Sequence, residues 1–125
     1  MWVPKFLVCV FAVLLNFTAL AATSAPDPIA AALADPARPA ADRARDSLRK
    51  PASLLALAGV QAGQRVVDIG PGTGYYTRLL SHIVGPQGQV FAFNPTWLDT
   101  KFPKSREGVS ALIASGCTNV TASIQ

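Results

Sequence analysis

A glycine-rich run is the part of the sequence best suited to binding chemistry. It reads Asp68-Ile69-Gly70-Pro71-Gly72-Thr73-Gly74-Tyr75 and follows a β-branched, apolar segment. Glycines at 70 and 72 allow a sharp turn and let a ligand approach the backbone closely, while glycine at 74 allows a tight entry into a helix. The free amides at the start of that helix would offer donors to a polar ligand group. We therefore expect a binding loop that joins a strand to a helix.

The spacing of these glycines differs from two familiar phosphate-binding patterns. It is G-x-G-x-G, whereas the dinucleotide fingerprint requires a small residue where Tyr75 stands, and the P-loop pattern requires a lysine after the glycines. The single histidine, His82, and Cys117 have no companions at metal-ligand spacing. We expect neither a metal site nor a histidine–cysteine dyad, and we interpret His82 as a solvent-facing helix residue and Cys117 as a small buried one.

Hydrophobic periodicity predicts the elements that would position the loop. Segment 65–69 resembles a parallel strand covered on both faces, and 89–93 is a second strand that Asn94-Pro95 stops. Helices are predicted after Gly74, with an apolar face, and over 105–115, before a third strand over 119–124. The apolar helix face comprises Tyr76, Leu79, Leu80 and Ile83. Alternating strands and helices predict an α/β fold, a βαβαβ half of an open, Rossmann-like sheet with three parallel strands.

Proline and alanine dominate the segment before the predicted sheet. Residues 26–41 are interpreted as an Ala/Pro-rich linker or a short helical turn, and the partial domain as residues 42–125. Asp42 is expected to cap a helix running to about Arg49, and Pro51 to begin a helix that reaches Ala58. Arginines alternate with aspartates here and the net charge is only +4, which predicts a solvated face and no nucleic-acid partner.

The first 25 residues have the pattern of a secretory signal peptide. Lys5 precedes an apolar run from Phe6 to Leu15, and small residues follow, so cleavage is expected after Ala21 or Ala22. An exported protein, periplasmic or secreted, would result, with no stable membrane anchor after cleavage. The alternative is an uncleaved inner-membrane anchor, for which Asn16 and Thr18 leave a short apolar run.

The run DIGPGTGYYT, with the Val66-Val67 strand before it, resembles motif I of class I S-adenosylmethionine-dependent methyltransferases. Residues 35–81 also resemble a group of predicted bacterial methyltransferases with export signals. The resemblance implies that Asp68 contacts the methionine amino end of the cofactor, often through water. It also implies that Gly70, Gly72 and Gly74, with Pro71 and Thr73, shape the loop beneath the cofactor. Tyr75 would be an edge contact, while Tyr76 would belong to the core.

One position departs from the family pattern. In the family the second strand usually ends in an acidic residue whose two oxygens bind the ribose hydroxyls, but this sequence has Asn94. An amide has one carbonyl acceptor and no charge, so the resemblance implies weaker or rearranged ribose binding.

The resemblance implies a methyltransferase that uses S-adenosylmethionine on an unknown acceptor and is incomplete in this chain. It covers roughly residues 35–125, the first half of the family's sheet, and assigns no catalytic residue. Two other interpretations remain open, an exported nucleoside-cofactor-binding module without catalysis and a truncated remnant. Half of a sheet would also leave an apolar edge, which predicts aggregation or dimerisation through the third strand.

Overall fold

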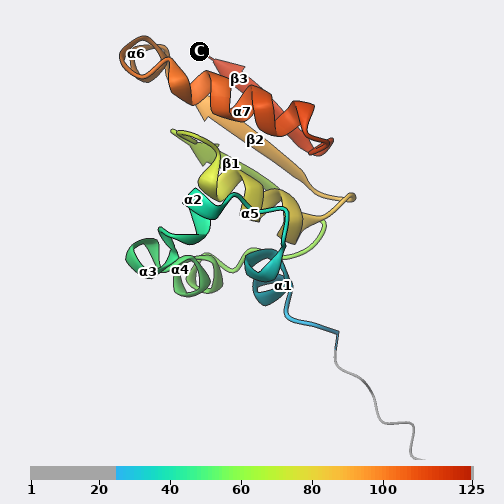
Figure 1. Ribbon diagram of the computed structural model, residues 1–125. Helices are drawn as coiled ribbons and strands as arrows, with labels where there is room; N and C mark the ends of the chain where they lie inside the picture. The colour runs from blue at the N-terminus through green and yellow to red at the C-terminus, as the bar shows by residue number, and fades with distance from the viewer. Residues whose placement is uncertain (1–24, 125) are drawn as a thin grey trace, which may run out of the picture.

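Three parallel strands form the single sheet of the computed structural model, which describes residues 25–124 (Figure 1). They are β1 (Arg65–Ile69), β2 (Gln89–Asn94) and β3 (Val120–Ile124), in the spatial order β1-β2-β3. The registers pair Val67 with Phe91, and Phe91 with Thr121. The predicted α/β fold with three parallel strands is confirmed, and the strand bounds differ from those predicted by at most one residue.

Seven helices accompany the sheet in the described residues. Helix α5 follows β1 directly, and α6 and α7 form the crossover from β2 to β3. The helices are α1 (Pro28–Ala34), α2 (Ala40–Arg43), α3 (Asp46–Arg49), α4 (Pro51–Leu57), α5 (Tyr75–Val84), α6 (Thr96–Lys101) and α7 (Lys104–Ala114). Of these, α6 is not predicted by the sequence pattern, because six residues are too few for apolar periodicity to show.

The hydrophobic core lies between the sheet and the helices on one of its faces. Buried side chains from β2 and β3 meet the inner side of α5 and α7, and Ala32 of α1 completes the cluster. The core includes Leu79, Ile83, Val84, Val90, Val109, Leu112 and Val120. Burial of this apolar surface positions α5, and with it the glycine loop that precedes α5.

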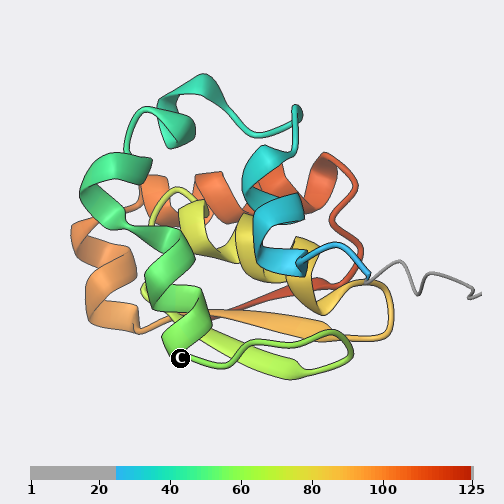
Figure 2. The ribbon, with the colours of Figure 1, turned by 90° about the horizontal axis from the view of Figure 1, so that it is seen from below.

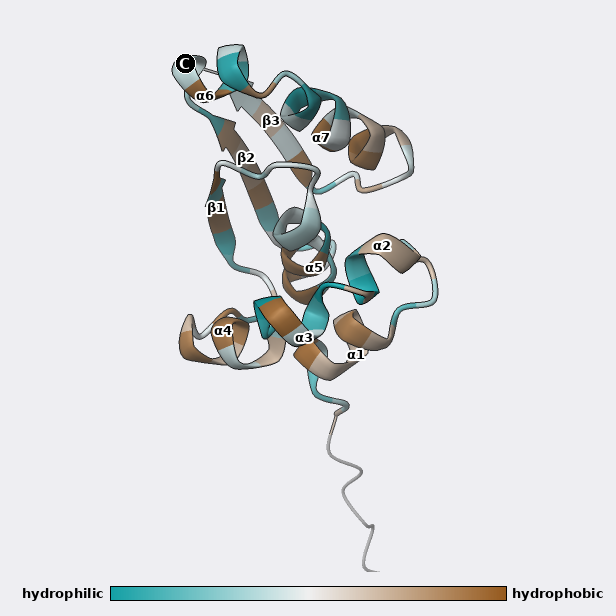
Figure 3. Cartoon of the chain, turned by 60° about the vertical axis from the view of Figure 1, so that its left-hand side comes forward, coloured by the Kyte–Doolittle hydropathy of each residue, from teal (hydrophilic) through white to brown (hydrophobic). Residues whose placement is uncertain are grey.

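The opposite face of the sheet is bare in the described part of the chain. Figure 2 shows the helices gathered on one side of the strands, and Figure 3 shows hydrophobic residues along β1 and β2. Val67 is 56% exposed and Ile69 is 70% exposed. The prediction that β1 is covered on both faces is therefore wrong for residues 25–124, because α5 packs on the side of β1 where Val66 and Asp68 are half-buried.

Part of the predicted linker is an integral helix. Asp27 caps α1 by accepting a hydrogen bond from the amide of Ile29 at 2.9 Å, and Pro28 occupies its first turn. Helix α1 packs against α5 and α4, and Ala32 is fully buried. Of the two interpretations of residues 26–41, the structure thus shows the helical one, with the helix packed on the core.

Of two expectations about the arginine–aspartate segment, one is wrong and the other holds only for part of the segment. Asp42 does not cap a helix: it lies inside the short helix α2 and is buried, where it pairs with Arg45 and Arg78. The solvated face holds for Arg43, Arg49 and Lys50, which are exposed. It fails for Arg38, which is buried and binds the Asp46 carboxylate through both terminal nitrogens, at 2.9 and 2.7 Å. The alternation of charges here reflects pairing within the fold.

Helix α4 begins at Pro51 as predicted, but of its leucines only Leu55 is buried, while Leu57 is almost fully exposed. His82 is exposed, as predicted, and Cys117 is half-buried against the core. The predicted signal peptide lies in residues outside those described, except for Ala25. Among the described helices none has the length and apolar character needed to span a membrane.

Candidate functional site

The glycine loop stands between the carboxyl end of β1 and the first turn of α5. All three of its glycines have left-handed backbone angles, with φ of +69° at Gly70, +58° at Gly72 and +86° at Gly74. The amide of Gly70 donates to the carbonyl of Phe93 on β2 at 2.9 Å, and that of Gly74 donates to the carbonyl of Pro71 at 3.0 Å. A side chain at any of the three positions would be strained, which explains the G-x-G-x-G spacing.

Open space lies above the middle of the loop. A Cβ atom built on Gly72 would meet no other atom within 4 Å, whereas at Gly70 it would lie 3.1 Å from Cδ2 of Leu98. Thr73 is exposed and Pro71 is buried. The loop therefore has packed ends and an accessible centre, the arrangement that a ligand resting on the backbone requires.

Asp68 connects β1 to the start of α5. Its carboxylate accepts a hydrogen bond from Oγ1 of Thr77 at 2.6 Å, and Thr77 is completely buried in the first turn of the helix. Burial raises the pKa of the Asp68 carboxyl, and the hydrogen bonds from the Thr77 hydroxyl and amide oppose that effect. The carboxylate thus holds an amide of the helix start beside the loop, and its remaining lone pairs are available to a ligand amine.

Tyr75 is more buried than the predicted edge contact would be, whereas Tyr76 packs against the core as predicted. Tyr75 is only 3% exposed, and its hydroxyl donates to Oδ1 of Asp46 at 2.5 Å. The guanidinium of Arg49 lies over its ring at 4.8 Å. Tyr76 is the half-buried one, and its hydroxyl donates to the carbonyl of Arg49 at 3.1 Å. Tyr75 therefore anchors the N-terminal helices to the residue that follows the loop, and is not an edge contact.

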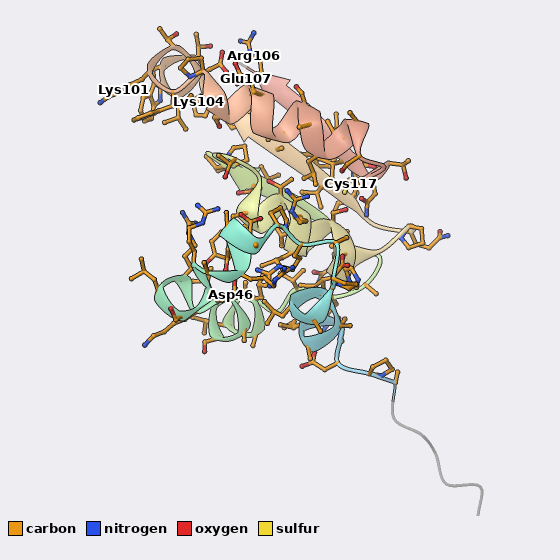
Figure 4. All side chains as sticks on the ribbon, in the orientation of Figure 1. Asp46, Lys101, Lys104, Arg106, Glu107 and Cys117 are labelled. Atoms are coloured by element: carbon orange, nitrogen blue, oxygen red, sulfur yellow. The ribbon has the colours of Figure 1, made fainter. Side chains whose placement is uncertain are left out.

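Burial and the hydrogen bond to Asp46 raise the pKa of Tyr75 to about 12. Conversely, the hydrogen bond from Arg38 lowers the pKa of Asp46 below its ordinary value. Figure 4 labels Asp46 near α3, on the side of α5 away from α7. The neutral phenol and the charged carboxylate stabilise each other in this arrangement.

Helix α7 contacts the loop from the other side through a glycine. A Cβ atom on Gly108 would lie 2.6 Å from Cα of Thr73 and 2.9 Å from its carbonyl carbon, so α7 approaches the loop backbone as closely as a helix can. A Cβ on Gly74 would in turn lie 3.6 Å from Cδ2 of Leu112. Sequence reasoning missed Gly108, although a glycine inside an apolar-periodic helix is a signal of close packing.

Asn94 ends β2 as predicted, but its side chain is only 4% exposed. Its Nδ2 donates to Oδ1 of Asp99 at 3.3 Å, and its Oδ1 accepts from the hydroxyl of Ser105 at 3.3 Å. A narrow cavity of about 20 Å³ lies beside it, lined partly by Pro71 of the loop and by Arg106. The structure thus brings Asn94 and the loop to the same edge of the sheet, where ligands of open α/β sheets bind.

The same edge contains no cluster of metal-binding side chains. Across residues 25–124 the histidine, cysteine and acidic side chains do not group so that three could hold an ion. The groups that the loop offers are backbone amides, the Asp68 carboxylate and the polar side chains at the end of β2. They suit an organic ligand that carries amino and hydroxyl groups.

Comparison with known proteins identifies relatives of this loop region. A family model described as protein-L-isoaspartate(D-aspartate) O-methyltransferase matches residues 43–97, which include β1, the loop, α5 and β2. A ubiquinone/menaquinone biosynthesis C-methyltransferase, UbiE, of Pseudomonas fluorescens strain Pf0-1 is 58% identical over 36 residues. That match covers 29% of this chain and 14% of the relative. The UbiE protein of Pseudomonas aeruginosa strain PAO1 is 53% identical over 36 residues, with the same coverage.

A solved structure matches a longer part of the chain. It is a SAM-dependent methyltransferase from Aquifex aeolicus, with a TM-score of 0.51 and 31% sequence identity. The match covers 79% of this chain and 47% of the Aquifex chain. The chain therefore spans less than half the length of each of these relatives.

Proposed function

Because this chain belongs to the class I S-adenosylmethionine-dependent methyltransferases, we propose that it binds S-adenosylmethionine on the loop 70–74 and presents the cofactor's methyl group for transfer. The observation that carries the proposal is the accessible centre of the loop. The three left-handed glycines and the open space over Gly72 form a backbone surface with no side chain between it and a ligand.

The residues at the loop fit the cofactor. Asp68 lies at the end of β1 with a charged or hydrogen-bonding oxygen for the methionine amino group, and the first-turn amides of α5 lack helical partners. The polar end of β2, with Asn94, lies beside the loop, and we assign the ribose to this side. When bound, the cofactor supplies a methyl group on a positively charged sulfur. The contribution of these residues is to hold that group in place, because methyl transfer depends mainly on positioning.

Two glycine variants test the proposal, one in the loop and one as its control. Gly72→Val would place a side chain in the space above the loop and should abolish binding of S-adenosylhomocysteine, the demethylated form of the cofactor, in calorimetry. Gly63→Val is the matched control, since Gly63 also has a positive φ and no atom within 4 Å of a built Cβ, but lies before β1 at the other end of the strand. Equal affinities of wild type and Gly72→Val would remove the loop from the site.

The proposal extends to the cofactor and the class of reaction. One of the similar families is named for O-methyl transfer and the similar Pseudomonas proteins for C-methyl transfer, so the chemical type of the acceptor differs among relatives. A binding module without catalysis would bind S-adenosylhomocysteine with the same dependence on Gly72. It would not transfer the methyl group of S-adenosylmethionine to any acceptor supplied.

We also propose that the protein is exported, on the strength of the apolar run and the small residues that follow it. Cleavage after Ala21 or Ala22 would leave Asp27, the cap of α1, in the mature chain. N-terminal sequencing of the protein from a periplasmic or secreted fraction tests this. An intact Met1 in the membrane fraction would favour the anchor.

A further inference from the structure

The side chain of Asn94 is occupied by protein contacts. Its amide nitrogen donates to Asp99 and its carbonyl oxygen accepts from Ser105, and it is almost fully buried. These contacts tie the end of β2 to α6 and α7. The Asn94 carbonyl oxygen keeps one lone pair beyond the one that Ser105 uses, but because only 4% of the residue is exposed, that lone pair is poorly accessible to a ligand.

A carboxylate lies directly beside Asn94. Asp99, in α6, has a side chain 12% exposed, within 3.3 Å of the Asn94 amide nitrogen. Helix α6 also contacts the loop, since Cδ2 of Leu98 is the nearest atom to a Cβ built on Gly70. The Asp99 carboxylate thus lies near the place where the end of β2 meets the glycine loop.

Arg106 of α7 holds Asp99 in place and charged. Its Nε donates to Oδ1 of Asp99 at 3.2 Å and its Nη2 donates to Oδ2. The hydrogen bond from Arg106 lowers the pKa of the Asp99 carboxyl below its ordinary value. Arg106 itself is exposed, and Figure 4 shows it at the end of α7 nearest α6. A charged carboxylate is therefore fixed at this position before any ligand arrives.

A carboxylate has about four lone-pair positions, and the protein fills three of those of Asp99. Oδ1 accepts from Asn94 and Arg106, and Oδ2 accepts only from Arg106. One acceptor position remains on Oδ2. We propose that Asp99 uses it to accept a hydrogen bond from one ribose hydroxyl of bound S-adenosylmethionine, in place of an acidic residue at position 94. This assignment rests on the proposed function.

The same geometry explains why residue 94 is an amide. An aspartate at 94 would place a second carboxylate oxygen about 3.3 Å from that of Asp99, and two like charges so close disfavour each other's ionisation. Asparagine instead donates a hydrogen bond to Asp99. The negative charge that the family pattern places at the end of the strand is thus carried here by Asp99 of α6. An acidic residue at 94 alone would repel the Asp99 carboxylate.

Calorimetry on the full chain with three probes tests the assignment. The probes are S-adenosylhomocysteine and its 2′-deoxy and 3′-deoxy analogues. We expect Asp99→Asn to weaken binding of S-adenosylhomocysteine about tenfold or more, as loss of a charged hydrogen bond predicts. We further expect one of the two deoxy analogues to bind wild type more weakly than S-adenosylhomocysteine does. The same analogue and S-adenosylhomocysteine should bind Asp99→Asn with equal affinity. Glu107→Gln, an exposed neighbour on α7 with the same change of charge, is the control and should bind like wild type.

Position 94 supplies a second and independent test. Asn94→Asp should weaken binding, and the exchanged pair Asn94→Asp with Asp99→Asn should recover most of the lost affinity. If Asp99→Asn fails to fold by circular dichroism, these two variants decide. Tighter binding by Asn94→Asp, or unchanged hydroxyl dependence in Asp99→Asn, would overturn the role of Asp99 while leaving the proposed function standing. No binding of S-adenosylhomocysteine by wild type would instead overturn the proposed function, and this assignment with it.

Discussion

Replacing Gly108 with alanine should damage cofactor binding from a helix outside the loop. The added Cβ would lie 2.6 Å from Cα of Thr73, and ordinary carbon contacts are about 3.5–4.0 Å, so α7 or the loop must move by about 1 Å. Overpacking of this kind costs about 1–3 kcal/mol, against a gain of about 0.5–1 kcal/mol from alanine in a helix. We expect a net loss of about 1–2 kcal/mol in the free energy of unfolding.

The loop displacement should also weaken binding of S-adenosylhomocysteine by at least about tenfold, because ligand positioning is sensitive to shifts of about 1 Å. Gly88→Ala is the matched control: its Cβ would lie 2.5 Å from Cβ of Val84 and 2.7 Å from the Gln64 carbonyl oxygen, but Gly88 precedes β2, at the opposite end of the sheet. Urea unfolding and calorimetry on both variants separate the effects. Equal loss of affinity in the two variants, or full affinity in a stable Gly108→Ala, would refute the reasoning.

Two further predictions concern the N-terminal helices. The pKa of Tyr75 is raised from 10.0 to about 12, so the stability that it contributes, about 3 kcal/mol, is complete below pH 10 and lost as the pH rises to about 12. Urea unfolding from pH 9 to 12 should show the advantage of wild type over Tyr75→Phe shrinking across this window, and a constant advantage would contradict it. Lys50 has a left-handed conformation, with φ of 46°, so Lys50→Gly should stabilise the fold by about 0.5–1 kcal/mol, whereas Lys50→Ala should give no gain in the urea midpoint.

The strands, the glycine loop and helix α5 could be predicted because each is encoded by a short contiguous pattern in the sequence. The β-branched run at 65–69, the turn residues after it and the periodicity of α5 placed the loop correctly. The contacts that shape the site join residues distant in sequence: Tyr75 and Asp46 are 29 positions apart, and Gly108 and Thr73 are 35 positions apart. Periodicity alone does not specify such pairs. It therefore assigned Arg38 and Asp42 to solvent and Tyr75 to the ligand, although each is buried by a tertiary partner.

The contacts of Leu98, Gly108 and Leu112 with the glycine loop also have a consequence for biosynthesis. These residues are synthesised after Gly74, together with the whole of β2, so the loop leaves the ribosome before the groups that fix its shape exist. Contacts between distant parts of a chain form late because loop closure must precede them. A nascent chain that has completed only α5 therefore carries the glycine motif without its binding geometry. If the protein crosses a membrane unfolded, the site takes shape only after translocation of α7.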